Sequence, residues 1–153
     1  MPGIDPDALG FLLNDISRLI RASMDRAHAR SGIGVTPGEA RVLAFAARTG
    51  PVRQTRLAEQ IGVEAMTLSG HLDGLEGKGL IARQADPSDR RAKIVTLLPA
   101  ADAVLDAIGA TGRAIRAQAS AGFEDEEWEQ LKAALKRVRS NLCEKGVEAS
   151  DAA

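Results

Sequence analysis

The sequence predicts a mainly helical α+β fold, in which a small winged helix-turn-helix lobe lies between N- and C-terminal helical arms. Three observations predict it. Apolar residues recur at helical spacing in both terminal thirds of the 153-residue chain. Two short amphipathic segments joined by a glycine turn at 62–63 occupy the middle, as in a helix-turn-helix. Two strand-like segments, 80–83 and 93–98, follow and enclose a polar turn, which is typical of a hairpin wing.

The N-terminal segment predicts one long helix. Asp5 suits its cap and Pro6 its first turn, and the helix should end near Ser31-Gly32. At ~1.5 Å per residue, a helix of about 25 residues is roughly 38 Å long. A small lobe cannot cover an apolar stripe of that length, so we expect the stripe to need a partner surface.

Three helices are expected in the central lobe. The first begins at a capping box, Thr36-Pro37-Gly38-Glu39, and ends before Gly50-Pro51. The next covers roughly 54–61. The third runs from about 64 to 78, with Leu68, Leu72 and Leu75 on one face.

The C-terminal third predicts two more helices, one from about Pro99 and one from about Phe123. In the last helix, apolar residues step by three and four from Trp128 to Leu142, like a coiled-coil seam. We therefore assign 1–33 and 99–145 to a helical dimerisation region, 34–98 to the winged lobe and 146–153 to a flexible tail. Two chains that interleave their arms would form a homodimer with two-fold symmetry.

Composition limits the classes of function. The formal net charge is -1, so any nucleic-acid site must depend on local positive charge. One cysteine, Cys143, excludes a disulfide framework within the chain and a zinc site built on paired cysteines. Two distant histidines give no metal-ligand spacing, and no motif predicts an enzyme or a cofactor. With neither a membrane-spanning run nor a signal segment, we expect a cytoplasmic protein.

Three motifs carry a family resemblance. LAEQIGVE at 57–64, LDGLEGKGLI at 72–81 and DRRAK at 89–93 resemble the multiple-antibiotic-resistance regulator (MarR) family, and are most similar to its SlyA branch. The resemblance implies a homodimeric transcriptional regulator, a repressor, that binds an inverted-repeat operator in double-stranded DNA. It places the helix at 64–78, the fourth of the chain, in the major groove and the wing in the minor groove. It also implies release from DNA by a small anionic aromatic effector.

The wing residues take their roles from that resemblance. Arg91 is the tip residue that enters the minor groove, Asp89 orients it through a charge-assisted hydrogen bond, and Arg90 contacts the backbone or the groove. Arginine suits a narrow minor groove because the negative potential is enhanced there. A solvated turn with incidental charge is the alternative.

The fourth helix offers polar side chains beside its apolar stripe: Glu64, Thr67, Ser69 and His71. They can contact bases or phosphates. Alternatively, Thr67 bonds locally at the helix start and His71 packs half-buried beside the stripe. Candidate phosphate contacts are Arg53, Arg56, Lys78 and Arg83, each of which is alternatively a solubilising charge.

The chain also departs from the family. Gly70 and Gly74 stand where relatives often carry arginine or another long polar side chain, so readout of guanine by arginine is missing. Either the wing and DNA shape supply specificity, or the chain is a winged-helix interaction protein that has lost specific DNA binding and acts through protein partners. Ala40 replaces an aromatic residue and leaves room for a ligand beside Met24, His28 and Phe45. The alternative is a core repacked with smaller residues.

Overall fold

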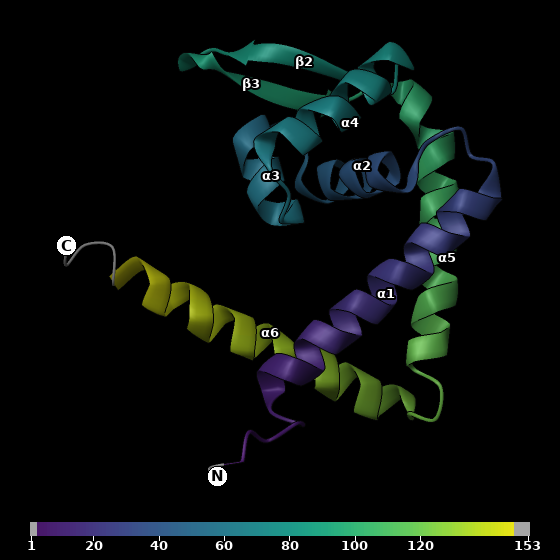
Figure 1. Cartoon of the computed structure of the whole chain (residues 1–153), viewed down its shortest axis with the longest axis vertical. Coiled ribbons are helices and arrows are strands. Elements are labelled where there is room, and N and C mark those ends of the chain that lie inside the picture. The colour runs from purple at the N-terminus through teal and green to yellow at the C-terminus, as the bar shows by residue number, and fades with distance from the viewer. Residues whose placement is uncertain (1–2, 149–153) are drawn as a thin grey trace. The chain divides into compact units, whose positions relative to one another are not determined.

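The computed structural model describes residues 3–148. The chain divides into two compact units, one up to Ile115 and one from Arg116, and each is described by itself (Figure 1). None of the described helices combines the length and the hydropathy that crossing a bilayer would need.

The first unit contains most of the elements. In order they are α1 (Leu9–Ser31), α2 (Pro37–Thr49), β1 (Val52–Arg53), α3 (Gln54–Ile61), α4 (Ala65–Gly77), β2 (Ile81–Asp86), β3 (Asp89–Leu97), a short 3-10 helix (Pro99–Ala101) and the first part of α5 (Asp102–Ala119). The predicted fold class, mainly helical with a small winged sheet, is confirmed.

Helix α1 begins later than predicted, and the cap assigned to Asp5 is wrong. The helix starts at Leu9, after Ala8, which makes no side-chain cap. The Asp5 carboxylate instead accepts the backbone N–H of Asp7 at 2.9 Å, so it closes a separate turn ahead of the helix. Gly32, at φ 64°, ends α1 in the left-handed conformation that glycine adopts without strain.

The capping box at the start of α2 is confirmed. Thr36 Oγ1 accepts the Glu39 N–H at 3.2 Å, and Glu39 Oε2 accepts the Thr36 N–H at 2.7 Å. Ala40, Val42 and Leu43 then face inward and are fully buried. Helix α2 is therefore the central element of the core, and α3 and α4 both pack against it.

The sheet has the antiparallel order β1-β3-β2. Strand β1, which the sequence analysis did not predict, pairs Val52 with Val95, while β2 pairs Ile81 with Leu97. The β2–β3 hairpin continues beyond the lobe as a wing and lies beside α4 (Figure 1).

The second unit contains the end of α5 and α6 (Asp125–Glu148), which are joined at Gly122 with φ 86°. The rings of Phe123 and Trp128 meet edge to face, with their centroids 5.5 Å apart. Helix α6 extends three residues into the tail predicted from 146 onward, and the rest of that tail, 149–153, lies outside the described residues.

Candidate DNA-binding site

Helices α3 and α4 form the predicted helix-turn-helix. Gly62, at φ 73°, makes the turn between them, and its N–H donates to Ala58 O at 2.9 Å. Leu68, Leu72 and Leu75 are fully buried, which confirms the predicted apolar stripe of α4. The exposed surface of α4 consists of Ala65, Met66, Thr67, Gly70, Asp73, Glu76 and Gly77.

The four polar residues predicted on this helix lie in different surroundings. Glu64 precedes α4 as its N-cap residue, without a side-chain cap, and both Glu64 and Thr67 are exposed. Ser69 and His71 are half-buried. The imidazole of His71 lies against Gly38 of α2, where a Cβ would come within 2.5 Å of Nε2. The structure thus favours the packed alternative for His71, at the α2–α4 interface.

Gly74 lies at a second point where α2 and α4 approach each other closely. A Cβ at this position would overlap Glu39 Oε1 and lie 3.4 Å from Glu39 Cδ. Gly70 and Gly77 face open space, with no atom near their Cβ positions. One of the two departures from the family therefore has a packing reason, because Gly74 admits a carboxylate from the opposing helix. Gly70 has no such neighbour.

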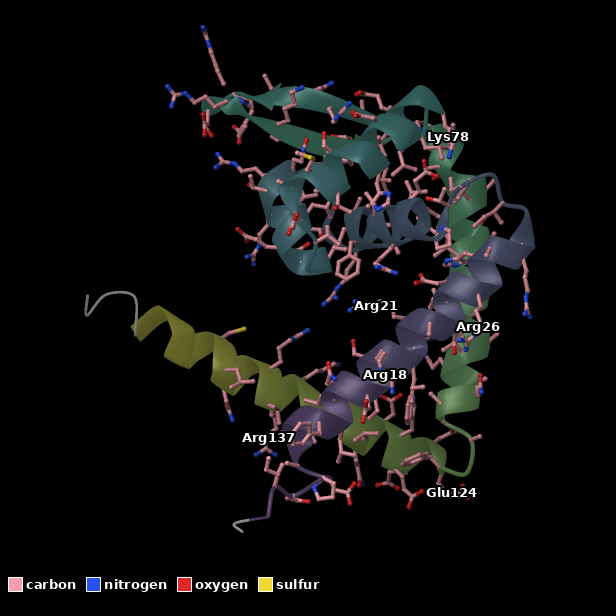
Figure 2. All side chains as sticks on the ribbon, viewed as in Figure 1. Arg18, Arg21, Arg26, Lys78, Glu124 and Arg137 are labelled. Atoms are coloured by element: carbon pink, nitrogen blue, oxygen red, sulfur yellow. The ribbon has the colours of Figure 1, made fainter. Side chains whose placement is uncertain are left out.

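The Glu39 carboxylate also holds the C-terminal end of α4 in place. Glu39 is only 5% exposed, and its Oε2 accepts a hydrogen bond from Lys78 Nζ at 2.5 Å. Burial disfavours its charge, but hydrogen bonds from Lys78 and Thr36 outweigh burial and hold the pKa of Glu39 below its ordinary value. Lys78, at the C-terminal end of α4 (Figure 2), is thus ion-paired. Neither this pairing nor the role of Glu39 beyond the capping box was predicted.

A second buried carboxylate fixes the base of the wing. Asp86 Oδ1 accepts the Ser88 N–H at 2.8 Å and the Ser88 hydroxyl at 2.7 Å, and Oδ2 accepts from Arg53 Nε at 2.6 Å. The hydrogen bonds from Ser88, followed by that from Arg53, lower the pKa of Asp86 to about 2. Arg53, predicted as a phosphate contact, therefore holds β1 to the wing.

The wing tip carries the exposed side chains of Arg90 and Arg91. Neither forms an ion pair within the described residues. The charge-assisted bond expected between Asp89 and the Arg91 side chain is not formed. Asp89 Oδ1 instead accepts the backbone N–H of Arg91 at 3.0 Å. Asp89 thus shapes the start of β3 and leaves the Arg91 guanidinium free.

The other candidate phosphate contacts have protein partners. Arg56 pairs with Glu59 at 3.2 Å, with both side chains largely exposed. Arg83 bridges Asp73 at 2.7 Å and Glu76 at 2.5 Å, and these bonds raise its pKa further. An exposed pair such as Arg56–Glu59 exchanges readily because it contributes little stability. Arg83, whose side chain is only 14% exposed, is held more firmly.

The four predicted ligand residues line one cavity of about 570 Å³ between α1 and α2, reaching the end of α3. Met24, Ala40 and Phe45 belong to its apolar wall. His28 is 4% exposed, and its buried Nε2 has no hydrogen-bond partner among the described residues. Burial lowers the pKa of His28, and the nearby Asp25 opposes this only in part. Arg21, which was not predicted from the sequence, projects from α1 toward the cavity (Figure 2).

Comparisons with known proteins agree with this geometry. The model of the MarR family matches residues 35–93. The solved structure of the transcriptional regulator PA3341 is 36% identical, with a TM-score of 0.72 over 87% of this chain and 96% of that one. A MarR-family regulator from Silicibacter pomeroyi is 28% identical, with a TM-score of 0.75 over 88% and 89% of the two chains.

BpsR of Bordetella bronchiseptica is a more distant match, and its DNA binding is regulated by 6-hydroxynicotinic acid. It is 21% identical, with a TM-score of 0.68 over 91% of this chain and 98% of that one, so it supports the fold alone. The helix-turn-helix, the wing and the similarity to PA3341 over nearly the whole of both chains lead to one conclusion. The chain belongs to the MarR family, whose members are transcriptional regulators and not enzymes.

Proposed function

We propose that this chain is a repressor that binds an inverted-repeat operator as a homodimer in the cytoplasm, and that its nearest branch is SlyA. The observation that carries the proposal is the free charge of the wing tip. Arg90 and Arg91 are exposed and unpaired within the described residues, whereas Arg53, Lys78 and Arg83 are held by carboxylates. Unpaired guanidinium groups on a narrow hairpin suit the minor groove.

The exposed surface of α1 supports the homodimer. Seven large apolar side chains in its first half are exposed: Leu9, Phe11, Leu12, Leu13, Ile16, Leu19 and Ile20. A contiguous apolar surface of this kind marks an interface. We assign it to a second copy of the chain because regulators of this family act as dimers. Residues 1–33 and 99–145 then form the dimerisation region, and 34–98 form the DNA-binding lobe.

The α1–α2 cavity supports a small anionic aromatic effector. Its apolar wall suits a ring, while Arg21, in no ion pair of the described residues, supplies positive charge. The unpartnered Nε2 of His28 can hydrogen-bond a polar substituent of that ring. The aromatic acid that regulates BpsR has this chemistry and is a suitable first probe.

DNA binding is tested by selecting bound sequences from randomised duplexes and measuring their affinity by fluorescence anisotropy. The wild type should enrich an inverted repeat, and Arg91→Ala should weaken binding to it. Arg48→Ala is the matched control, because it removes the same charge from an exposed residue at the end of α2. Equal losses in the two variants would contradict a specific role for the wing. If no sequence were enriched, the interaction protein that has lost specific DNA binding would be the better interpretation.

Effector binding is tested separately with 6-hydroxynicotinic acid, by thermal shift and by release of labelled operator. A ligand at one hundred times its Kd stabilises the folded state by about 2.7 kcal/mol. Arg21→Ala should remove this effect. Arg26→Ala, a change at an exposed arginine of the same helix, should preserve it. Failure of this compound alone would leave DNA binding intact and would contradict the proposed effector class.

A further inference from the structure

The exposed face of α4 carries an unusual side chain for a helix that reads DNA. Met66, the second residue of α4, is 84% exposed, more than any other large apolar side chain in the described chain. Most of the other exposed apolar side chains lie on α1 and α6. Met66 lies instead on the winged lobe, on the helix face opposite the buried leucines. Core packing therefore does not explain it.

Apart from Thr67, which is also exposed, few side chains around Met66 can contact a base. One turn along the same face, Gly70 has no neighbouring atoms, so the backbone itself is open there. Asp73 follows, and its carboxylate is paired with Arg83 at 2.7 Å. Arg83 also pairs with Glu76, so it offsets only one of the two negative charges that repel phosphates here. The face contains no lysine or arginine, so it lacks the side chains that most often read guanine.

The major groove displays one apolar group, the C5-methyl of thymine. Residues in the first turn of a recognition helix are the ones that reach base edges. We propose that Met66 is a specificity-determining residue that recognises thymine by packing against this methyl group, with the bare backbone at Gly70 allowing α4 a close approach. This inference rests on the proposed function, since it requires α4 to lie in the major groove.

A substitution in the DNA isolates the methyl group. Each thymine of the selected operator is replaced in turn by deoxyuridine, which pairs identically and lacks only the methyl. The wild type should lose about fourfold in affinity at one position of each half-site, the effect of uncovering one apolar carbon. Met66→Ala should bind the thymine and uracil operators equally at that position. Met66→Leu, which keeps the apolar bulk, should retain the discrimination.

The outcomes separate this inference from the proposed function. A wild type that binds its operator specifically, yet is indifferent to uracil at every position, would overturn the role of Met66 and leave the regulator intact. Discrimination that persists in Met66→Ala would overturn it as well. If no sequence were selected from the randomised pool, the proposed function would fail and the inference with it. Because Met66 is exposed, circular dichroism should confirm that each variant folds like the wild type.

Discussion

Alanine substitutions at two glycines of α4 should change stability in opposite directions. At Gly70 a new Cβ meets no atom, so the variant gains the helix propensity of alanine, about 1 kcal/mol. For a chain of this size, 1 kcal/mol corresponds to roughly 2–4 °C, so the Tm of this variant should rise by roughly 2–4 °C. Gly70→Ala is thus the matched control for the same change one turn further along.

At Gly74 the same gain in propensity is outweighed. The new Cβ displaces the Glu39 carboxylate, whose Oε2 bonds Lys78 Nζ at 2.5 Å and the Thr36 N–H at 2.7 Å. Losing a charge-assisted bond costs about 1.5 kcal/mol and losing the capping bond about 1 kcal/mol. After the gain of about 1 kcal/mol in propensity, Gly74→Ala should be destabilised by about 1.5 kcal/mol. Its Tm should fall by roughly 3–6 °C.

Thermal unfolding of the two variants measures this difference, and a double-mutant cycle identifies its cause. In a Glu39→Ala background, the obstacle to a Cβ at position 74 is gone, so Gly74→Ala should become stabilising. If Gly74→Ala raised Tm as much as Gly70→Ala in the wild-type background, the carboxylate of Glu39 would not lie on Gly74. The packing explanation for that glycine would then be refuted.

Three further predictions concern the wing, the cavity and the arm. Ser88→Ala should raise the pKa of Asp86 from about 2 toward 3.8, which NMR titration measures, and an unchanged pKa would contradict the role of Ser88. Because the native pKa is lowered, the stabilisation from Asp86 is complete above pH 3.8 and is lost as the pH falls toward 2. Burial lowers the pKa of His28, so stability should decrease as the pH falls below 6.5, and denaturant unfolding of His28→Leu should not show that decrease. Leu19→Glu should yield a monomer in analytical ultracentrifugation, and a dimer that survives it would place the interface elsewhere.

Local patterns predicted the elements well. The leucines of α4 repeat at helical spacing, and the capping box of α2 is a contact across three residues, so both can be recognised in the sequence alone. The cap at Asp5 was misassigned because Asp5 bonds within its own turn, a conformation that competes with capping. Strand β1 was missed because two residues are too few to show alternation, and its pairing with β3 depends on residues far along the chain.

The charges of the site could not be predicted in the same way. Lys78 and Glu39 are 39 residues apart, and Arg53 and Asp86 are 33 apart, so only the folded chain brings each pair together. Gly74 was recognised as a departure from the family, but its reason lies in the facing helix. The cavity residues Met24, His28, Ala40 and Phe45 were easier to find, because each lies on one of two adjacent helices, α1 or α2.

These pairs also explain how a chain with a net charge of -1 can present a positive surface to DNA. Two buried carboxylates of the lobe form structural ion pairs: Asp86 holds the start of the wing through Arg53, and Glu39 holds the end of α4 through Lys78. Each carboxylate pairs with a cation from another element, so the basic side chains nearest the helix-turn-helix are largely neutralised within the protein. The exposed cations of the lobe that pair with no carboxylate among the described residues are Arg48, Arg90, Arg91 and Lys93, and the last three lie on β3 of the wing. Electrostatic attraction to phosphates should therefore come mainly from the wing, while α4 contributes contacts that depend on shape and on apolar surface.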